Sequence, residues 1–97
     1  MKNLLGLKDE QTISDFKLIL TCPACPEQYE VFDKKGKQVG YLRLRGGWFR
    51  VDYPDCGIKT IYEAYPKGDG IFDEDERGYF LIEAVQAIKN ELMKENK

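Results

Sequence analysis

Two adjacent glycines, Gly46 and Gly47, constrain the fold more than any other part of the sequence. They separate two segments in which apolar and polar residues alternate, and alternation with a period of two is typical of β-strands with one buried face. A two-residue loop between antiparallel strands requires positive φ angles, which glycine adopts without a steric penalty. We therefore expect a hairpin with strands at 39–45 and 48–53 and Gly46-Gly47 as its loop.

The hairpin loop also determines which residues face each other across the two strands. Arg45 is expected opposite Trp48 and Arg43 opposite Arg50, with successive pairs on alternate sides of the sheet. One side carries an apolar quartet that suits a buried core, namely Leu42, Leu44, Phe49 and Val51. The reverse side carries aromatic and basic side chains, namely Tyr41, Arg43, Arg45, Trp48 and Arg50.

Further strands and one helix are predicted around this hairpin. Alternating residues bounded by turn residues predict strands at 16–20, 28–33 and 59–65. Asp73 and Glu76 form a capping-box-like pair, after which Leu81, Val85, Ile88 and Leu92 recur at helical spacing, so we expect one helix of about five turns. The predicted fold is a single α+β domain, residues 1–97, with a C-terminal helix packed across one face of a four- to five-stranded antiparallel meander. Residues 1–12 are predicted as either a short helix or a loose arm.

Charged residues are segregated along the chain, although its net charge is only −2. Residues 34–59 carry seven basic and two acidic side chains, and acidic residues predominate on both sides of this segment. An acidic chain is not typical of a general nucleic-acid binder, whose domains are commonly basic. The sequence has no apolar run of membrane-spanning length and no signal-peptide pattern at its start, so a cytoplasmic location is expected.

The basic and aromatic side of the hairpin has two interpretations. In the first it is a solvated face, where Glu30 or Glu63 of a neighbouring strand lies between the opposed arginines and Arg45 stacks on Trp48. In the second it binds a partner, because arginine and tryptophan are enriched at the energetic centres of protein interfaces. We predict a non-catalytic module that uses this side to bind a protein or a second copy of the chain. Single-stranded nucleic acid is the alternative partner, since bases stack on aromatic rings.

Three cysteines suggest a further alternative, a small zinc-binding domain. Cys22-Pro23-Ala24-Cys25 has the spacing at which two thiolates bind one metal ion. The segment Tyr53-Pro54-Asp55-Cys56-Gly57 is similar to a second such knuckle in which Tyr53 replaces the first cysteine. Cys22, Cys25 and Cys56 are therefore candidate ligands of a degenerate zinc ribbon. The competing interpretation is that the thiols are reduced and only pack as small apolar groups.

Motifs for catalysis are missing from the sequence. The chain has no histidine, which removes the ordinary Ser-His and Cys-His pairs, and it has no glycine-rich phosphate-binding motif. The acidic segment 69–76 lacks the ligand spacing of a calcium-binding loop, so it is predicted to cap the helix instead. No catalytic residue and no cofactor other than the alternative zinc ion are predicted.

The segment Tyr41-Leu42-Arg43-Leu44-Arg45-Gly46-Gly47-Trp48-Phe49-Arg50-Val51-Asp52-Tyr53-Pro54-Asp55, followed by 62–70, resembles small uncharacterised proteins of Gram-positive bacteria and their mobile elements. The likeness covers approximately residues 20–80 and includes no catalytic motif. It implies a cytoplasmic protein of a bacterium or phage, and it implies no activity.

Overall fold

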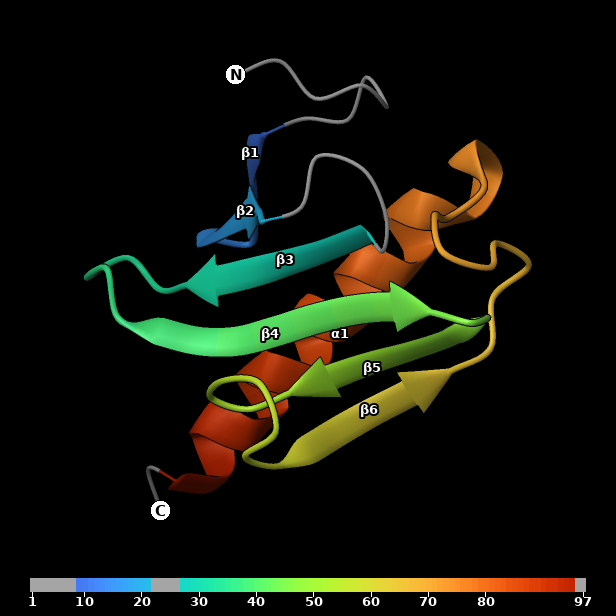
Figure 1. Ribbon diagram of the computed structural model, residues 1–97. Coiled ribbons are helices and arrows are strands. Elements are labelled where there is room, and N and C mark those ends of the chain that lie inside the picture. Colours follow the sequence, from blue (N-terminus) through green and yellow to red (C-terminus); the bar gives the residue numbers. More distant parts are fainter. Residues whose placement is uncertain (1–8, 22–26, 96–97) are drawn as a thin grey trace.

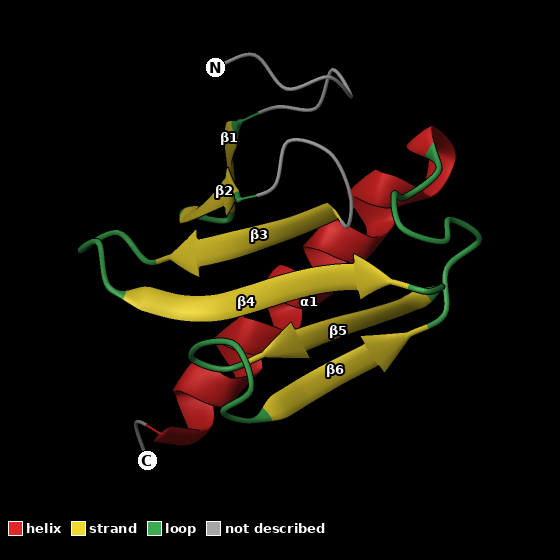
Figure 2. Ribbon diagram, in the orientation of Figure 1, coloured by secondary structure: helices red, strands yellow, loops and turns green. Residues whose placement is uncertain are grey.

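The computed structural model describes residues 9–21 and 27–95, which form one antiparallel sheet and one helix. The strands are β1 (Glu10–Ile13), β2 (Phe16–Leu20), β3 (Glu27–Phe32), β4 (Gln38–Arg45), β5 (Trp48–Asp52) and β6 (Thr60–Ala64), and the helix is α1 (Glu74–Glu95). The six strands lie side by side in chain order. Figure 1 shows α1 crossing behind the sheet, and Figure 2 shows that no helix of the described residues covers the opposite face. The predicted α+β meander with one C-terminal helix is therefore confirmed.

The Gly46-Gly47 hairpin has the predicted register. Arg45 pairs with Trp48, and the pairing continues to Tyr41 opposite Asp52. The φ angles of Gly46 and Gly47 are 59° and 75°, as a two-residue loop between twisted strands requires. Because β4 and β5 have neighbours on both sides, this one pairing determines which residues lie on each face of the central sheet.

The predicted number of strands, four to five, is wrong, because the sheet has six. Residues 10–12, predicted as part of a short helix or loose arm, belong to β1, which pairs with β2. The two strands are joined by Ser14 and Asp15, whose φ angles are 49° and 72°. A loop of positive φ angles without glycine is uncommon, so the sequence does not reveal this hairpin. Residues 1–8 lie outside the described residues.

The core lies between the sheet and α1. The predicted quartet is fully buried, together with the helical residues Leu81, Ala84, Val85 and Ile88. Leu92, also predicted in the apolar stripe, is only partly buried. β4 approaches α1 so closely that a Cβ atom on Gly40 would lie 3.2 Å from Cγ1 of Ile88 and closer still to its Cδ1. The helix has 22 residues, which is about six turns rather than five.

Candidate binding surface on the open face of the sheet

The five predicted binding residues lie together on the face of the sheet opposite α1, which we call the outer face. Tyr41, Arg43 and Arg45 come from β4, and Trp48 and Arg50 come from β5. Each alternates with a fully buried residue of the core quartet, and this alternation directs the five side chains away from the helix. The separation of the hairpin into two chemically different faces is thus present in the structure.

Four of these residues line a hollow on the outer face, which we call the arginine groove. They are Arg43, Arg45, Trp48 and Arg50, and the hollow has a volume of about 180 Å³. Trp48 is 37% exposed, so part of its ring is accessible from solvent. The groove therefore offers an aromatic surface among guanidinium groups.

Arg50 and Trp48 hold each other in place, which differs from the predicted stacking of Arg45 on Trp48. The Arg50 Cζ atom lies 5.2 Å from the centre of the Trp48 ring, a cation-π distance. The Trp48 Nε1–H donates a hydrogen bond of 2.9 Å to Glu63, which pairs with Arg50 across β5 and β6. Arg50 Nε lies 3.1 Å from a carboxylate oxygen of Asp52. These contacts offset the repulsion between the opposed arginines.

Asp52 is the functional neighbour that the sequence analysis missed. Its side chain is 1% exposed, and its two carboxylate oxygens accept hydrogen bonds of 2.7 Å from the Gly57 amide and 2.8 Å from the Thr60 hydroxyl. Asp52 therefore positions Arg50 and also anchors the loop between β5 and β6. An aspartate at a strand end, just before a turn that contains glycine, is a signal for such backbone capping.

Arg43 and Arg45 differ from Arg50, because neither has a carboxylate within 4 Å among the described residues. The Nε atoms of Arg43 and Arg50 are both buried without a hydrogen-bond partner among the described residues, but Arg50 Nε lies 3.1 Å from a carboxylate oxygen of Asp52, whereas Arg43 has no carboxylate nearby. Glu30, which was predicted to lie between arginines, pairs with Tyr41 in the sheet instead. The Tyr41 hydroxyl donates a 3.0 Å hydrogen bond to Gln28. Burial, and next the neighbouring Cys56, raise the pKa of Tyr41.

Of the three cysteines predicted as zinc ligands, the structure describes one. Cys22 and Cys25 lie outside the described residues, whereas Cys56 has an exposed, free thiol. Its Sγ atom lies 4.0 Å from Nη2 of Arg50, on the loop that follows β5. The described residues contain no group of three cysteine or carboxylate side chains that could hold a metal ion. The zinc ribbon therefore stays a prediction.

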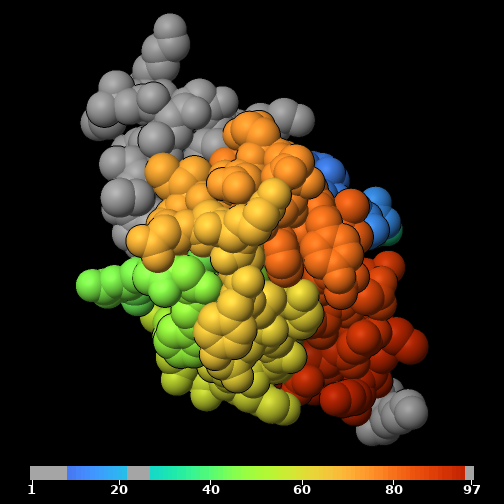
Figure 3. Space-filling view, turned by 90° about the vertical axis from the view of Figure 1, so that its right-hand side faces the viewer, coloured from blue at the N-terminus to red at the C-terminus, as the bar shows by residue number. Residues whose placement is uncertain are grey.

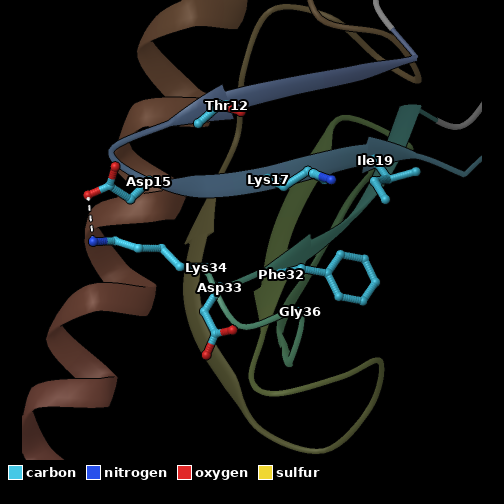
Figure 4. Close-up of a pocket in the computed structure, with 8 residues that line it drawn as sticks. All are labelled: Thr12, Asp15, Lys17, Ile19, Phe32, Asp33, Lys34 and Gly36. Atoms are coloured by element: carbon cyan, nitrogen blue, oxygen red, sulfur yellow. Dashed lines mark ion pairs between the residues drawn. The ribbon is translucent and has the colours of Figure 1, made fainter.

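A second hollow of about 370 Å³ lies on the outer face over β1, β2 and the end of β3. Figure 4 shows Ile19 and Phe32 extending on one side of it, while Asp15 and Lys34 form an ion pair on the other. This ion pair spans 3.7 Å and joins the β1–β2 turn to the β3–β4 turn. The hollow combines apolar side chains with Lys17 but holds no unpaired buried polar group, so it is less distinctive than the arginine groove.

Within the acidic segment 69–76, predicted to cap the helix, Glu76 makes the capping contact that the structure shows. Glu76 accepts a hydrogen bond of 2.9 Å from the Asp73 amide, the backward half of a capping box. Its carboxylate also accepts hydrogen bonds from the amides of Lys67 and Gly68, at 2.9 and 2.8 Å. Burial alone would raise the pKa of Glu76, but these backbone donors outweigh it and lower that pKa. In Figure 3 the yellow and orange segment before α1 packs against the green β4–β5 hairpin, where the Gly47 amide donates to the Asp69 carbonyl at 2.6 Å.

A buried ion pair, which the sequence analysis also missed, joins the start of β3 to α1. Arg77 donates hydrogen bonds of 2.9 and 3.2 Å to the two carboxylate oxygens of Glu27. Tyr29 and the Phe72 amide donate to the same carboxylate. Burial alone would lower the pKa of Arg77, but Glu27 and Glu74 outweigh it and raise that pKa. The network supports the sheet end that carries Arg45 and Trp48.

Comparisons of the chain with protein-family models, with curated proteins and with solved structures find no match. The resemblance of 41–55 to small proteins of Gram-positive bacteria stays a prediction. Among the described residues, α1 is the only helix, and it is not apolar enough to cross a membrane. The geometry of the outer face is consequently the basis on which a function is proposed.

Proposed function

We propose that this protein is a non-catalytic binding module whose outer face binds an acidic segment of a partner protein. The binding residues are Tyr41, Arg43, Arg45, Trp48 and Arg50. The observation that carries the proposal is the pair Arg43 and Arg45, two guanidinium groups beside an exposed tryptophan with no carboxylate to neutralise them among the described residues. A cytoplasmic location in a bacterium or phage belongs to the same proposal.

The chemistry of the arginine groove favours carboxylates as its ligands. Guanidinium groups bind carboxylates through two parallel hydrogen bonds, and such charge-assisted bonds contribute about 1.5–3 kcal/mol each. Arg43 and Arg45 have no carboxylate within 4 Å among the described residues, so a ligand carboxylate would give them an ionic partner that this part of the chain does not supply.

Preorganisation of Trp48 and Arg50 also supports the proposal. Trp48 is held by Glu63 and Arg50, and Arg50 is held by the buried Asp52. A partner therefore meets an aromatic surface that is already ordered, and the entropy cost of binding decreases accordingly. Rigid tryptophan and arginine side chains of this kind commonly dominate the binding energy of protein interfaces.

A carboxylate beside the groove favours a protein over a nucleic acid. Glu63 pairs with Arg50 and accepts the hydrogen bond of Trp48, so it lies on the same face as the arginines. A continuous phosphate backbone would approach this carboxylate as well as Arg43 and Arg45, whereas a short acidic peptide can avoid it. The net charge of −2 further weakens the long-range attraction of a polyanion.

Trp48 provides a direct test, because it is the only tryptophan of the chain. We would titrate the protein with a short peptide rich in Asp and Glu and, separately, with an oligothymidylate of equal charge, and follow Trp48 emission. The variant Arg43→Gln/Arg45→Gln should weaken peptide binding by at least about tenfold, which corresponds to the loss of one charge-assisted contact. The matched control Lys17→Gln/Lys94→Gln removes the same charge from two exposed positions that do not line the arginine groove, and it should leave the affinity within about twofold.

Three outcomes would contradict the proposal. The peptide could leave Trp48 emission unchanged, the two double variants could weaken binding equally, or the oligothymidylate could bind more tightly than the peptide and depend on Arg43 and Arg45. The last result would assign the groove to single-stranded nucleic acid, and a steep decrease of affinity with salt would accompany it. Arg50→Ala is not a suitable probe, because it would remove the cationic partner of the buried Asp52.

A further inference from the structure

A second groove lies at the opposite end of the strands, between the turns and the C-terminal part of α1. We call it the lysine groove. It has a volume of about 640 Å³ and apolar walls formed by Phe16, Leu92 and Met93. Basic side chains surround these walls, namely Lys34, Lys35, Lys37 and Lys89. The lysine groove and the arginine groove have no lining residue in common.

Both acidic residues that line the lysine groove, Asp15 and Asp33, already have partners. Asp15 is paired with Lys34 at 3.7 Å, as Figure 4 shows. Asp33 accepts hydrogen bonds of 2.9 Å from the backbone amides of Lys35 and Lys37, so its carboxylate is held against the turn. The ammonium groups of Lys35, Lys37 and Lys89 have no carboxylate within 4 Å among the described residues. The groove is consequently a positive region on an acidic chain.

The apolar part of the groove is incompletely covered by the described residues. Met93 is 63% exposed at the last turns of α1, while Phe16 and Leu92 are partly buried against the core. Methionine is flexible and polarisable, and it is common on surfaces that receive apolar side chains of partner helices. Apolar walls with a basic margin complement a helix that has an apolar stripe and acidic flanks.

We propose that the lysine groove binds an acidic amphipathic helix of a partner protein. Acidic flanks on the partner helix are expected because three lysines around the groove lack a carboxylate partner among the described residues. The groove is concave, so it fits side chains that project from a helix at a spacing of three or four residues better than it fits a flat lipid surface. A volume of about 640 Å³ lies in the range of about 300–1,000 Å³ that is typical of binding pockets, so it accommodates a few such side chains.

A labelled synthetic helix with leucine at every third or fourth position and glutamate between them is the probe. We expect fluorescence anisotropy to show saturable binding that weakens as salt is added. Met93→Gln should weaken binding at least about threefold through lost apolar contact, and Lys35→Gln/Lys37→Gln/Lys89→Gln at least about tenfold through lost charge. All four positions face solvent at least in part, so the fold should be retained, and far-UV circular dichroism would verify this.

Matched controls separate this proposal from the proposed function of the outer face. Ile82→Gln replaces another apolar residue of α1 that is 57% exposed, outside the lysine groove, and Arg43→Gln/Arg45→Gln alters only the arginine groove. Both controls should bind the helical probe within about twofold of the original protein. If the arginine variant loses the probe and the lysine variant keeps it, the lysine groove is not the site, and the arginine groove gains support.

Amide chemical-shift mapping on the unmodified protein gives a readout that needs no variant. The probe should perturb amides of 14–16, 33–37 and 89–93 more strongly than the rest of the chain. Absence of binding, or shifts spread evenly over the chain, would reject the proposal. Vesicles of phosphatidylcholine and phosphatidylserine form the last arm: binding to them in place of the helical probe would identify a lipid-binding surface and refute a protein partner.

Discussion

Replacement of Arg77 by methionine tests whether the buried ion pair holds β3 and α1 together. The Glu27 side chain is 0% exposed and the Arg77 side chain 13%. The substitution removes both guanidinium hydrogen bonds to Glu27 and a third, of 3.0 Å, to the Phe72 carbonyl. Tyr29 and the Phe72 amide are the donors to Glu27 that remain among the described residues.

The expected loss of stability in Arg77→Met follows from the buried Glu27 carboxylate, which loses its cationic partner. Removal of one partner of a buried ion pair costs about 3–5 kcal/mol, because the other charge is left uncompensated. Since two donors to Glu27 remain, we expect about 3 kcal/mol, a large part of the 5–15 kcal/mol that is typical of small domains. The variant Glu27→Gln/Arg77→Met removes both charges and keeps a polar group for the two donors, so we expect a loss of only about 1 kcal/mol.

Urea unfolding, followed by Trp48 emission and far-UV circular dichroism, measures these free energies. The variants and the original protein should have equal m values, which would indicate that they undergo the same unfolding transition. Lys94→Met is the matched control, because Lys94 is an exposed cation of the same helix, and its loss should change stability by about 0.5 kcal/mol. The explanation fails if Arg77→Met costs less than about 1 kcal/mol, or if the double variant is as unstable as the single one.

Gly40→Ala should lower the free energy of unfolding by about 1–3 kcal/mol, because the new Cβ atom overpacks against Ile88. Ile88→Val removes the clashing Cδ1 atom, so in urea unfolding the double variant should lose less stability than the sum of the two single variants. The pKa of Glu76 is lowered in the folded protein, so near the ordinary value of 4.5 the unfolded chain binds more protons and stability falls as the pH decreases. Glu76→Gln should show a shallower fall of urea midpoint below about pH 4.5; an identical fall would exclude Glu76 as a contributor. Asp52→Asn should accelerate hydrogen exchange at the Gly57 amide, which donates to the Asp52 carboxylate at 2.7 Å, and unchanged exchange there would contradict the anchoring role.

The central hairpin could be predicted because its determinants are local. Gly46 and Gly47 specify the loop, and once the loop is known the period of two assigns each neighbouring residue to a face. The same locality explains why the cap formed by Asp73 and Glu76 was predictable, since the two residues are only three apart. The composition of the outer face followed from the register alone.

The tertiary structure decided everything that depends on residues distant in sequence. Glu27 and Arg77 are fifty residues apart and carry no local pattern, so only the packing of α1 on β3 brings them together. The sequence predicted that Arg45 stacks on Trp48, whereas in the structure Arg50, paired with the buried carboxylate of Asp52, lies over the ring. The lysine groove arises because two turns and the end of α1 meet in space. The sequence by itself therefore determined the local hairpin and its two faces, whereas burial and long-range pairing decided which charges have an ionic partner among the described residues and which do not.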